Sequence, residues 1–424
     1  MNSLAFASAD EIKQEQNRLL KKQLAYVMKQ SPFYQRLFAG INLDEVHTID
    51  DLKKLPCTTK QDVANFNDDF FAVEKNKIID YCTTSGTTGN PVTIGLTESD
   101  LERLALNEKI TFETTLNSND VVQLMLTLDK QFMAGMAYYI GLRKIGCGIV
   151  RSGPGSPKFQ LESIKRHGVT ALVAVPSFLI KVIQYAKANA IDLNSLSVKN
   201  VFCIGEPIRE EAGYGSLQPN ILARKITDAW NVKLFGTYAS TEMQTAFSEC
   251  NYGNGGHLAP ELLIAEWLDD DGNEVAEGET GELTVTHLGV EGLPLVRYRT
   301  GDLCKKYSAP CACGKNSVRI SSILGRKNQM IKLNGTTVYP NAIIHVLKEF
   351  DLDDFLILVS QSDLQTDEVK LLVASSKAVN FETLIQSLHA KVKVKPTIIH
   401  ATQSEINSYR NSEDRKPKQV VFSN

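Results

Sequence analysis

The sequence lacks any long run of apolar residues, because no stretch reaches the roughly 18 residues that span a bilayer. It also lacks an excess of one charge, since 46 basic and 49 acidic residues leave a formal net charge of −3. Without a basic excess, nucleic acid is not an expected partner. Its eight cysteines in 424 residues are too few for a disulfide scaffold. We therefore expect a cytoplasmic protein with reduced thiols, no membrane span and no secretory signal.

The remaining composition is that of an ordinary globular chain, with 43% hydrophobic and 22% charged residues. This usage excludes a collagen, a coiled-coil rod and a wholly disordered chain. At roughly 100–200 residues per domain, the length predicts two to four units, or one large domain with a small one.

Apolar runs alternate with helical patterns between about residues 80 and 300. A further helical pattern covers residues 9–39, with Ser8 or Asp10 as its cap. The alternation predicts an α/β fold, in which a large multi-sheet N-terminal domain has mainly parallel sheets. The predicted strands are Val121–Leu126, Ala171–Val175, Val201–Ile204 and Lys233–Phe235, and the predicted helices are 158–167, 177–190 and 219–230.

The pattern changes after about residue 260, where Leu262–Trp267 and Gly281–Thr286 predict antiparallel strands. Beyond Gly325-Arg326 the order is strand, strand, helix, strand, which predicts a small α+β C-terminal domain. We therefore expect an N-terminal domain at 1–325 and a C-terminal domain at 326–424. The C-terminal elements are expected at Phe355–Ser360, Val369–Ala374, Phe381–Val392 and Thr397–His400.

The sharpest local signal is the loop Thr83–Pro91, with five hydroxyl residues in the six positions from Thr83 to Thr88. Glycines in such a loop let backbone N–H groups approach a ligand, and N–H groups with hydroxyls form a nest for phosphate oxygens. An ordinary Ser/Thr/Gly turn is the alternative. Asn90 and Pro91 follow Gly89, so the loop lacks the lysine of a Walker A motif, which disfavours a phosphoryl-transfer kinase.

Nine motifs follow one another along almost the whole chain. They are Ser31–Tyr34, Leu55–Lys60, Ser85–Pro91, Val175–Phe178, Gly205–Pro207, Tyr238–Glu242, Arg297–Asp302, Gly325-Arg326 and Gly335–Pro340. In these motifs the chain resembles the adenylate-forming superfamily of acyl-CoA synthetases, luciferases and peptide-synthetase adenylation domains. Within it, the chain is most similar to the phenylacetate–CoA ligases. The resemblance implies an enzyme that makes an acyl-AMP from a carboxylic acid and ATP, releases pyrophosphate, and passes the acyl group to coenzyme A.

The resemblance also implies how ATP is held. The β- and γ-phosphates would be bound by the loop residues Ser85, Gly86, Thr87, Thr88 and Gly89. The adenine would be bordered by Gly205, Glu206 and Pro207, with Tyr238 stacked on it and Ala239 and Ser240 beside it. Thr241 would contact the α-phosphate and Glu242 would ligate Mg²⁺, which prefers one or two carboxylates plus phosphates. Asp302 would accept both ribose hydroxyls, and Arg326 would bind ribose or phosphate.

The family's small domain carries a lysine that bridges the substrate carboxylate and the α-phosphate. Lys416 is the best match here and Lys418 the alternative, although Arg415 stands where relatives have glycine. A lysine acts at such a place as a movable point charge, with Thr88 or Thr241 assisting. The resemblance further implies a domain rotation about Asn328, which brings Gly335 near the thiol acceptor. A frayed basic tail is the alternative for this end of the chain.

Cys311 and Cys313 form a Cys-x-Cys turn, and Cys250 and His257 flank a glycine-rich loop. Three thiols and one imidazole suit a tetrahedral structural zinc ion. Unliganded cysteines in polar loops are the alternative.

The resemblance places the acid pocket beside the 130–140 and 176–178 stretches, where mostly apolar candidates fit a small-molecule site. These candidates are Phe132, Met133, Ala134, Tyr138, Phe178 and Ala239. We expect an aromatic, phenylacetate-like acid, with coenzyme A as the acceptor; a homodimer is compatible with the family. Two rivals remain open, namely transfer to a carrier-protein thiol and a non-catalytic nucleotide or acyl-CoA binding protein.

Overall fold

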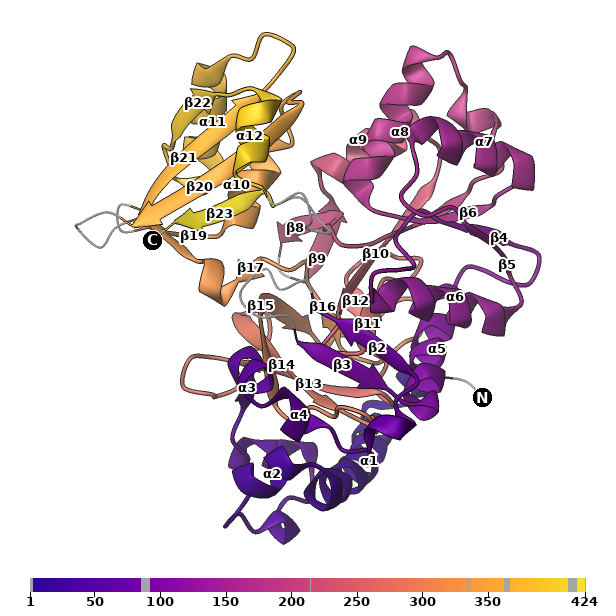
Figure 1. The fold of residues 1–424 in the computed structure, drawn as a ribbon, viewed down its shortest axis with the longest axis vertical. Helices are drawn as coiled ribbons and strands as arrows, with labels where there is room; N and C mark the ends of the chain where they lie inside the picture. Colours follow the sequence, from indigo (N-terminus) through magenta and orange to yellow (C-terminus); the bar gives the residue numbers. More distant parts are fainter. Residues whose placement is uncertain are drawn as a thin grey trace. The chain divides into compact units, whose positions relative to one another are not determined.

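The computed structural model describes residues 3–84, 92–213, 215–333, 336–361, 367–410 and 418–423 (Figure 1). Residues 85–91, Gly335 and Lys416, to which the sequence assigned roles, lie outside the described residues. The chain divides into two compact units. The first comprises Met1–Thr300 and Cys304–Ser322, and the second comprises Gly301–Leu303 and Ile323–Asn424. Among the described residues, no helix is both long and apolar enough to cross a membrane.

The first unit opens with two helices where the sequence predicted one. α1 (Ala9–Gln30) begins at Ser8, whose side chain forms a reciprocal capping box with Glu11. It ends one residue before Ser31, which is extended because the residue before a proline is driven out of the helical region. Pro32 then starts α2 (Pro32–Leu37). The helical pattern predicted over 9–39 is therefore confirmed up to Leu37, with a break at Ser31 that the prediction did not include. Short elements follow, namely β1 (Thr58–Thr59), α3 (Lys60–Asn65), α4 (Asn67–Phe70), β2 (Asp80–Thr83) and β3 (Thr93–Leu96).

Five parallel strands form half of the large sheet, in the order β5-β4-β6-β7-β10. They coincide with the strands predicted from the apolar runs, with β5 in addition. The strands are β4 (Val121–Leu124), β5 (Gly148–Arg151), β6 (Ala171–Ala174), β7 (Asn200–Cys203) and β10 (Lys233–Ser240). The connecting helices are α5 (Glu98–Phe112), α6 (Met133–Ile145), α7 (Pro157–His167), α8 (Pro176–Ala188) and α9 (Ile221–Ala229).

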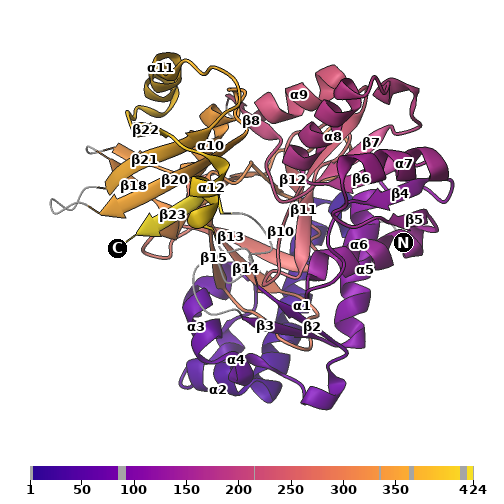
Figure 2. The ribbon, with the colours of Figure 1, turned by 45° about the horizontal axis from the view of Figure 1, so that its top comes forward.

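The helices cover both faces of this parallel half, with α7, α8 and α9 on one face and α5 and α6 on the other (Figures 1 and 2). Alternate residues of each strand enter two separate apolar clusters. Leu172 of β6 packs with α8 residues such as Leu179, whereas its neighbour Val173 packs with Tyr138 of α6. A strand buried on both faces explains the continuous apolar runs in the sequence.

The sheet continues into an antiparallel half through β11-β12-β16-β15-β14-β13. Its register pairs Leu263 with His287, and β1 adds to β15 in parallel. The fold class predicted from the sequence is confirmed, and so is the change to antiparallel strands after residue 260. The strands are β11 (Thr245–Ser248), β12 (Gly256–His257), β13 (Leu263–Leu268), β14 (Thr280–His287), β15 (Tyr298–Tyr307) and β16 (Arg319–Ile320), beside a separate hairpin of β8 (Arg209–Gly213) and β9 (Ser216–Pro219).

The second unit is built on a four-stranded mixed sheet in the order β22-β21-β20-β23. One face packs on α10 and α11 and the other on α12. The elements are β17 (Gly325–Arg326), β18 (Ile331–Leu333), β19 (Thr336–Val338), α10 (Pro340–Leu347), β20 (Asp354–Gln361), β21 (Asp367–Ala374), α11 (Phe381–Val392), β22 (Thr397–His400), α12 (Gln403–Ser408) and β23 (Val420–Ser423). The predicted α+β arrangement is confirmed for this unit. Single 3₁₀ turns lie at Leu4–Phe6, Leu43–Glu45, Ile49–Lys54, Lys75–Lys77, Leu193–Ser195 and Lys327–Gln329.

Candidate nucleotide and metal sites

Strand β10 changes partner at the point where the candidate nucleotide residues begin. Its first half pairs in parallel with β7, up to Gly236, and its second half pairs antiparallel with β11, from Thr237 onward. Tyr238, Ala239 and Ser240 therefore lie on a strand that runs beyond the parallel sheet. The Ser240 hydroxyl accepts from the backbone N–H of Met243 at 3.1 Å, which closes the turn carrying Thr241 and Glu242.

Two buried side chains that the sequence patterns did not reveal, Arg103 and His287, hydrogen-bond to the backbone near this site, and Arg103 holds the backbone after Glu242. Arg103 of α5 donates to the carbonyl oxygens of Gln244 at 2.7 Å and Leu288 at 2.9 Å, and also to that of Leu262. His287 Nδ1 accepts from the N–H of Leu295 at 3.1 Å. Burial, and then the charge of Arg103, lower the pKa of His287 well below its usual value, so this ring is neutral. No local pattern marks Arg103, because its neighbours on the helix face include the polar residues Ser99, Asp100 and Asn107.

Gln244 itself adopts a left-handed backbone conformation, with φ of +51°. A non-glycine residue rarely does so, and such strain persists only where surrounding contacts impose it. Its side chain donates to the carbonyl of Leu293 at 3.1 Å, in addition to the bond that its own carbonyl accepts from Arg103. The turn behind Glu242 is therefore rigidly anchored to the core.

Glu242 is buried and pairs with a lysine. The Nζ atom of Lys60 lies 3.2 Å from Oε1 of Glu242, and the two side chains are 29% and 11% exposed. Lys60 immediately follows β1, in the motif Leu55–Lys60 that the sequence marked without a role. The carboxylate of Glu242 is thus placed where a positive charge is accommodated, and its oxygens are of the kind that Mg²⁺ prefers as ligands.

The loop Gly205–Pro207, predicted to border adenine, is tied to the start of α8. Oε2 of Glu206 accepts from the N–H of Ser177 at 2.8 Å, where the positive end of the helix dipole favours a carboxylate. The carbonyl of Pro207 accepts from Asn220 at 2.8 Å, and Gly205 has φ of +71°. Two motifs that lie 29 residues apart in the chain thus form one structural element.

In the second unit, the two residues predicted to contact ribose lie side by side. β17 pairs antiparallel with the middle of β15, which sets Asp302 opposite Arg326. Nε of Arg326 lies 3.1 Å from Oδ1 of Asp302, whose carboxylate is 7% exposed. Gly301, just before Asp302 in β15, has a φ of +77°, a conformation that glycine adopts readily. A carboxylate oriented by a guanidinium can accept hydrogen bonds from hydroxyl groups.

The six candidate acid-pocket residues do not all come together. Phe132, Ala134 and Tyr138 pack against the cluster beneath α5 and α6, whereas Phe178 packs against the opposite cluster. Tyr138 is 3% exposed and meets Phe112 edge to face at 5.7 Å. Burial, and then the nearby Glu108, raise the pKa of Tyr138 above its usual range. Its described surroundings are those of a core residue.

The four candidate zinc ligands come together from separate strands and turns. Cys250 follows β11, His257 belongs to β12, and the Cys-x-Cys turn connects β15 to β16; their ligand atoms all lie within 4.8 Å of one another. The thiols of Cys250 and Cys311 are 3.6 Å apart, and Cys313 Sγ lies 3.6 Å from His257 Nε2. In a tetrahedron with Zn–S bonds of about 2.3 Å, neighbouring sulfurs are about 3.8 Å apart. The donor set and its spacing therefore fit zinc.

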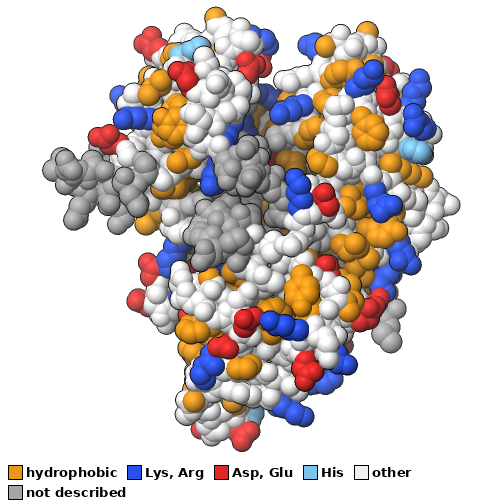
Figure 3. Space-filling view, in the orientation of Figure 1, with side chains coloured by type: hydrophobic (Ala, Val, Ile, Leu, Met, Phe, Trp, Pro, Cys, Tyr) orange, Lys and Arg blue, Asp and Glu red, His pale blue; other side chains and the backbone are white. Residues whose placement is uncertain are grey.

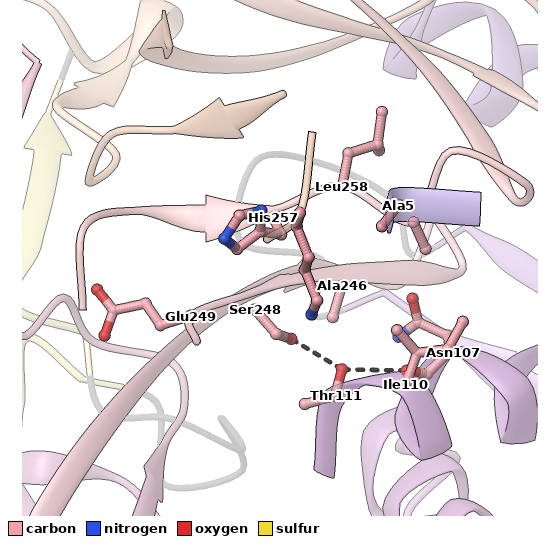
Figure 4. A pocket seen from close by; sticks show the side chains of 11 residues that line it. Ala5, Asn107, Ile110, Thr111, Ala246, Ser248, Glu249, His257 and Leu258 are labelled. Atoms are coloured by element: carbon pink, nitrogen blue, oxygen red, sulfur yellow. Dashed lines mark hydrogen bonds between the residues drawn. The ribbon is translucent and has the colours of Figure 1, made fainter. Parts of the chain in front are cut away.

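A small pocket adjoins this cluster, with His257 on its wall (Figure 4). Inside it, Thr111 and Ser248 share a hydrogen bond of 2.9 Å, and Thr111 donates to the carbonyl of Asn107 at 3.0 Å. These contacts join α5 to β11. The backbone N–H of Asn316 also donates to the carbonyl of Ala5 at 2.7 Å, so the cysteine turn is tied to the N-terminal segment. The cluster thus lies at a junction of α5, β11 and the first residues.

Basic and acidic side chains are interspersed on the face seen in Figure 3, in keeping with the near-neutral net charge of −3. No broad field of one sign is visible on that face.

Comparison with known proteins identifies a matching family model and several relatives that align with most of the chain. The family model described as AMP-binding enzyme matches residues 16–291. The phenylacetate-coenzyme A ligase of Thermus thermophilus is 25% identical over 92% of this chain and 91% of its own length. That of Escherichia coli is 26% identical over 83% and 79%, respectively. The protein CapK of Staphylococcus aureus is 20% identical over 90% of this chain and 82% of its own length.

Solved structures share the fold. A 2-hydroxyisobutyryl-CoA ligase, in the postadenylation state with an acyl-AMP, superposes with a TM-score of 0.84 at 19% identity, over 98% of this chain and 90% of that one. The o-succinylbenzoate coenzyme A synthetase of Bacillus subtilis, solved with ATP and magnesium, gives a TM-score of 0.58 at 17% identity, over 76% and 66%.

Proposed function

Because the chain belongs to the AMP-binding enzymes, as an adenylate-forming acid–CoA ligase, we propose that it activates an aromatic, phenylacetate-like carboxylic acid. The enzyme class follows from the family match over residues 16–291. The single observation that supports the aryl acid is the set of phenylacetate-coenzyme A ligases that align with most of the chain. Phe132 and Ala134 would line the acid pocket, and Tyr138 lies in the cluster against which they pack, whereas Phe178 packs against the opposite cluster and would not share this pocket.

The proposed nucleotide ligands come from several of the sequence motifs. Gly205, Glu206 and Pro207 would border adenine, with Tyr238, Ala239 and Ser240 along its other side. Asp302 would accept from the ribose hydroxyls and Arg326 would contact ribose or phosphate. The anchoring of Glu206 on α8 and of Asp302 on Arg326 supports these roles, since both carboxylates are already oriented by hydrogen bonds. The β- and γ-phosphate ligands would be Ser85, Gly86, Thr87, Thr88 and Gly89.

The first half-reaction needs no protein nucleophile. A carboxylate oxygen of the acid forms a bond to the α-phosphorus of ATP, the α–β phosphoanhydride bond breaks, and pyrophosphate leaves with its electron pair. Thr241 would donate a hydrogen bond to the α-phosphate, and Lys416 would place its ammonium between the carboxylate and that phosphate. Glu242 would hold Mg²⁺, which when bound neutralises phosphate charge.

In the second half-reaction the thiol of coenzyme A attacks the acyl carbon and AMP leaves. We propose that the C-terminal domain, residues 326–424, rotates about Asn328 between the two steps relative to the domain of residues 1–325. Gly335 would then border the path of the thiol. Delivery to a carrier-protein thiol remains the alternative acceptor.

A structural zinc ion forms the last part of the proposal. Cys250, His257, Cys311 and Cys313 would ligate it, and its role would be to fix the loop that leads away from β11. The set uses all four coordination positions, and a closed site is typical of structural rather than catalytic zinc.

Acid-dependent ATP–pyrophosphate exchange, measured across a panel of aryl and short alkyl acids, tests the function. We expect exchange with aryl acids, and thioester formation once coenzyme A is added. Exchange with alkyl acids alone would contradict the aryl substrate, and formation of ADP would contradict adenylation. Nucleotide binding without exchange for any acid would favour a non-catalytic binding protein. Exchange that is unaffected by K416A would remove the role given to Lys416.

A further inference from the structure

The carboxylate of Glu242 is already paired with a cation that the adenylation chemistry has not used. Lys60 Nζ lies 3.2 Å from Glu242 Oε1. Among the described residues, no other lysine or arginine lies within ion-pair distance of this carboxylate, and no other carboxylate lies within that distance of Lys60. The two groups are therefore each other's partners in the described part of the nucleotide-free chain.

The backbone of Lys60 is held firmly at this place. The N–H of Thr58 donates to the carbonyl of Arg297 at 3.0 Å, and β1 pairs in register with the start of β15. Thr59 then caps α3, and its hydroxyl donates to Asp62 at 2.6 Å. The backbone of Lys60 is therefore fixed by β1 before it and by the start of α3 after it. This placement brings the lysine side chain within reach of Glu242.

The pair is more shielded than the other lysine pairs on the surface of the first unit. Its side chains are 29% and 11% exposed, whereas those of Lys13 and Asp50 are 45% and 66% exposed. Shielded charges are less screened by salt, so the ammonium contributes to the local field. Glu242 is anchored from behind by the turn that Arg103 holds, and it therefore cannot move far from Lys60.

We propose that Lys60 is the resident counter-ion of Glu242 and competes with the divalent cation for this carboxylate, so that the metal binds only when the ammonium swings away. The proposal rests on the role of Glu242 as the Mg²⁺ ligand in the proposed function. Two cations cannot share one carboxylate face without strong repulsion. The lysine has a flexible four-carbon stem and can leave, whereas the carboxylate is fixed. Lys60 acts here as a positioning residue, which keeps the carboxylate of Glu242 oriented until the metal and nucleotide arrive.

Binding of Mn²⁺ to the nucleotide-free, full-length protein tests this competition without any turnover. The free-ion signal in electron paramagnetic resonance would be followed, and E242Q would identify the binding that depends on Glu242. K60M removes the charge but keeps an unbranched stem. We expect K60M to lower the dissociation constant of that site about threefold, as expected for the loss of one partly shielded ion pair. K60R, which keeps the charge, should bind Mn²⁺ no more tightly than the unaltered protein.

K77M is the matched control, because Lys77 is exposed and pairs with no carboxylate in the described part of the chain. It should leave Mn²⁺ binding unchanged. Equal or weaker Mn²⁺ binding by K60M would overturn the competition, as would binding unaffected by E242Q. ATP–pyrophosphate exchange by the unaltered protein, measured in parallel, separates the two proposals. If exchange occurs but K60M does not bind Mn²⁺ more tightly, only the role of Lys60 is refuted. If no exchange occurs, the proposed function is refuted.

Discussion

The thiols of Cys250 and Cys311, 61 positions apart in the chain, lie 3.6 Å from each other. This separation equals that of neighbouring ligands around one ion rather than of a disulfide, whose sulfurs are about 2.05 Å apart. His257 and Cys313 complete the set within 4.8 Å. The arrangement joins the glycine-rich loop after β11 to the turn before β16.

The purified protein should contain one zinc ion per chain. Elemental analysis measures the content, and a strong chelator should lower the melting temperature, because metal binding contributes to folding. C311S should lose the zinc and show the same lower melting temperature without chelator.

C57S provides the control, since Cys57 is a free thiol outside the cluster. It should retain the zinc and respond to chelator as the unaltered protein does. Full zinc content in C311S would contradict the assignment of this ligand.

Replacement of Arg103 by Met should destabilise the first unit. The change leaves the buried carbonyls of Gln244, Leu262 and Leu288 without their donor. Each unsatisfied buried polar group costs about 1–3 kcal/mol, so a loss of about 3 kcal/mol or more is expected in the free energy of urea unfolding. R143M, at an exposed arginine of α6, should change it by less than about 0.5 kcal/mol. Equal stability of R103M and the unaltered protein would show that the anchoring is unimportant.

The free energy of unfolding should fall as pH rises, because the buried side chain of Glu108 loses its proton. Burial raises the pKa of this carboxyl from 4.5 to about 8, although its bond from Asn107 lowers it slightly. The folded chain therefore binds the proton more tightly than the unfolded chain. The contribution is fully present below pH 4.5 and is lost as pH rises toward 8.

E108Q mimics the protonated form and should flatten the dependence of the unfolding free energy on pH between 5 and 8. One such group gives a slope of at most about 1.4 kcal/mol per pH unit. E102Q, at an exposed glutamate of the same helix that pairs with Lys144, should keep the slope. A slope unchanged in E108Q would mean that Glu108 is ionised when folded.

D302N should raise KM for ATP, because it weakens the hydrogen bonds to the ribose hydroxyls. The amide can accept only through one oxygen and has no charge, so KM for ATP should rise at least tenfold, which corresponds to about 1.4 kcal/mol. Comparison of ATP with 2′-deoxy-ATP and 3′-deoxy-ATP is the decisive measurement. The unaltered enzyme should discriminate against both analogues, and D302N should lose most of that preference. Equal discrimination by both proteins would remove Asp302 from the ribose site.

Local sequence patterns were enough to predict the fold class and most elements. The apolar runs at Ala171–Val175 and Val201–Ile204 became β6 and β7, because strands buried on both faces need continuous apolar residues. The helical pattern over 9–39 is interrupted at Ser31, which precedes Pro32 and could not continue the first helix, although that signal was present in the sequence.

Only part of the candidate site could be predicted from sequence patterns. Ordered motifs gave Tyr238–Glu242 and the Gly205–Pro207 loop, but not the buried Arg103 that anchors Gln244. Phe178 was grouped with Phe132, yet the two pack on opposite faces of the sheet. Residues adjacent in a motif list need not share a face, because side chains alternate along each strand and helices cover both sides.

By itself, the sequence determined the alternation of strands and helices, the start of α1 near Ser8 or Asp10, and the residue types available for zinc and nucleotide. These depend on interactions between near neighbours. Only the tertiary structure decided that Lys60 meets Glu242, that Ser177 meets Glu206, and that four zinc-ligand candidates converge. Such contacts join residues far apart in the chain, and their distances are set by strand order and register, which no local pattern records.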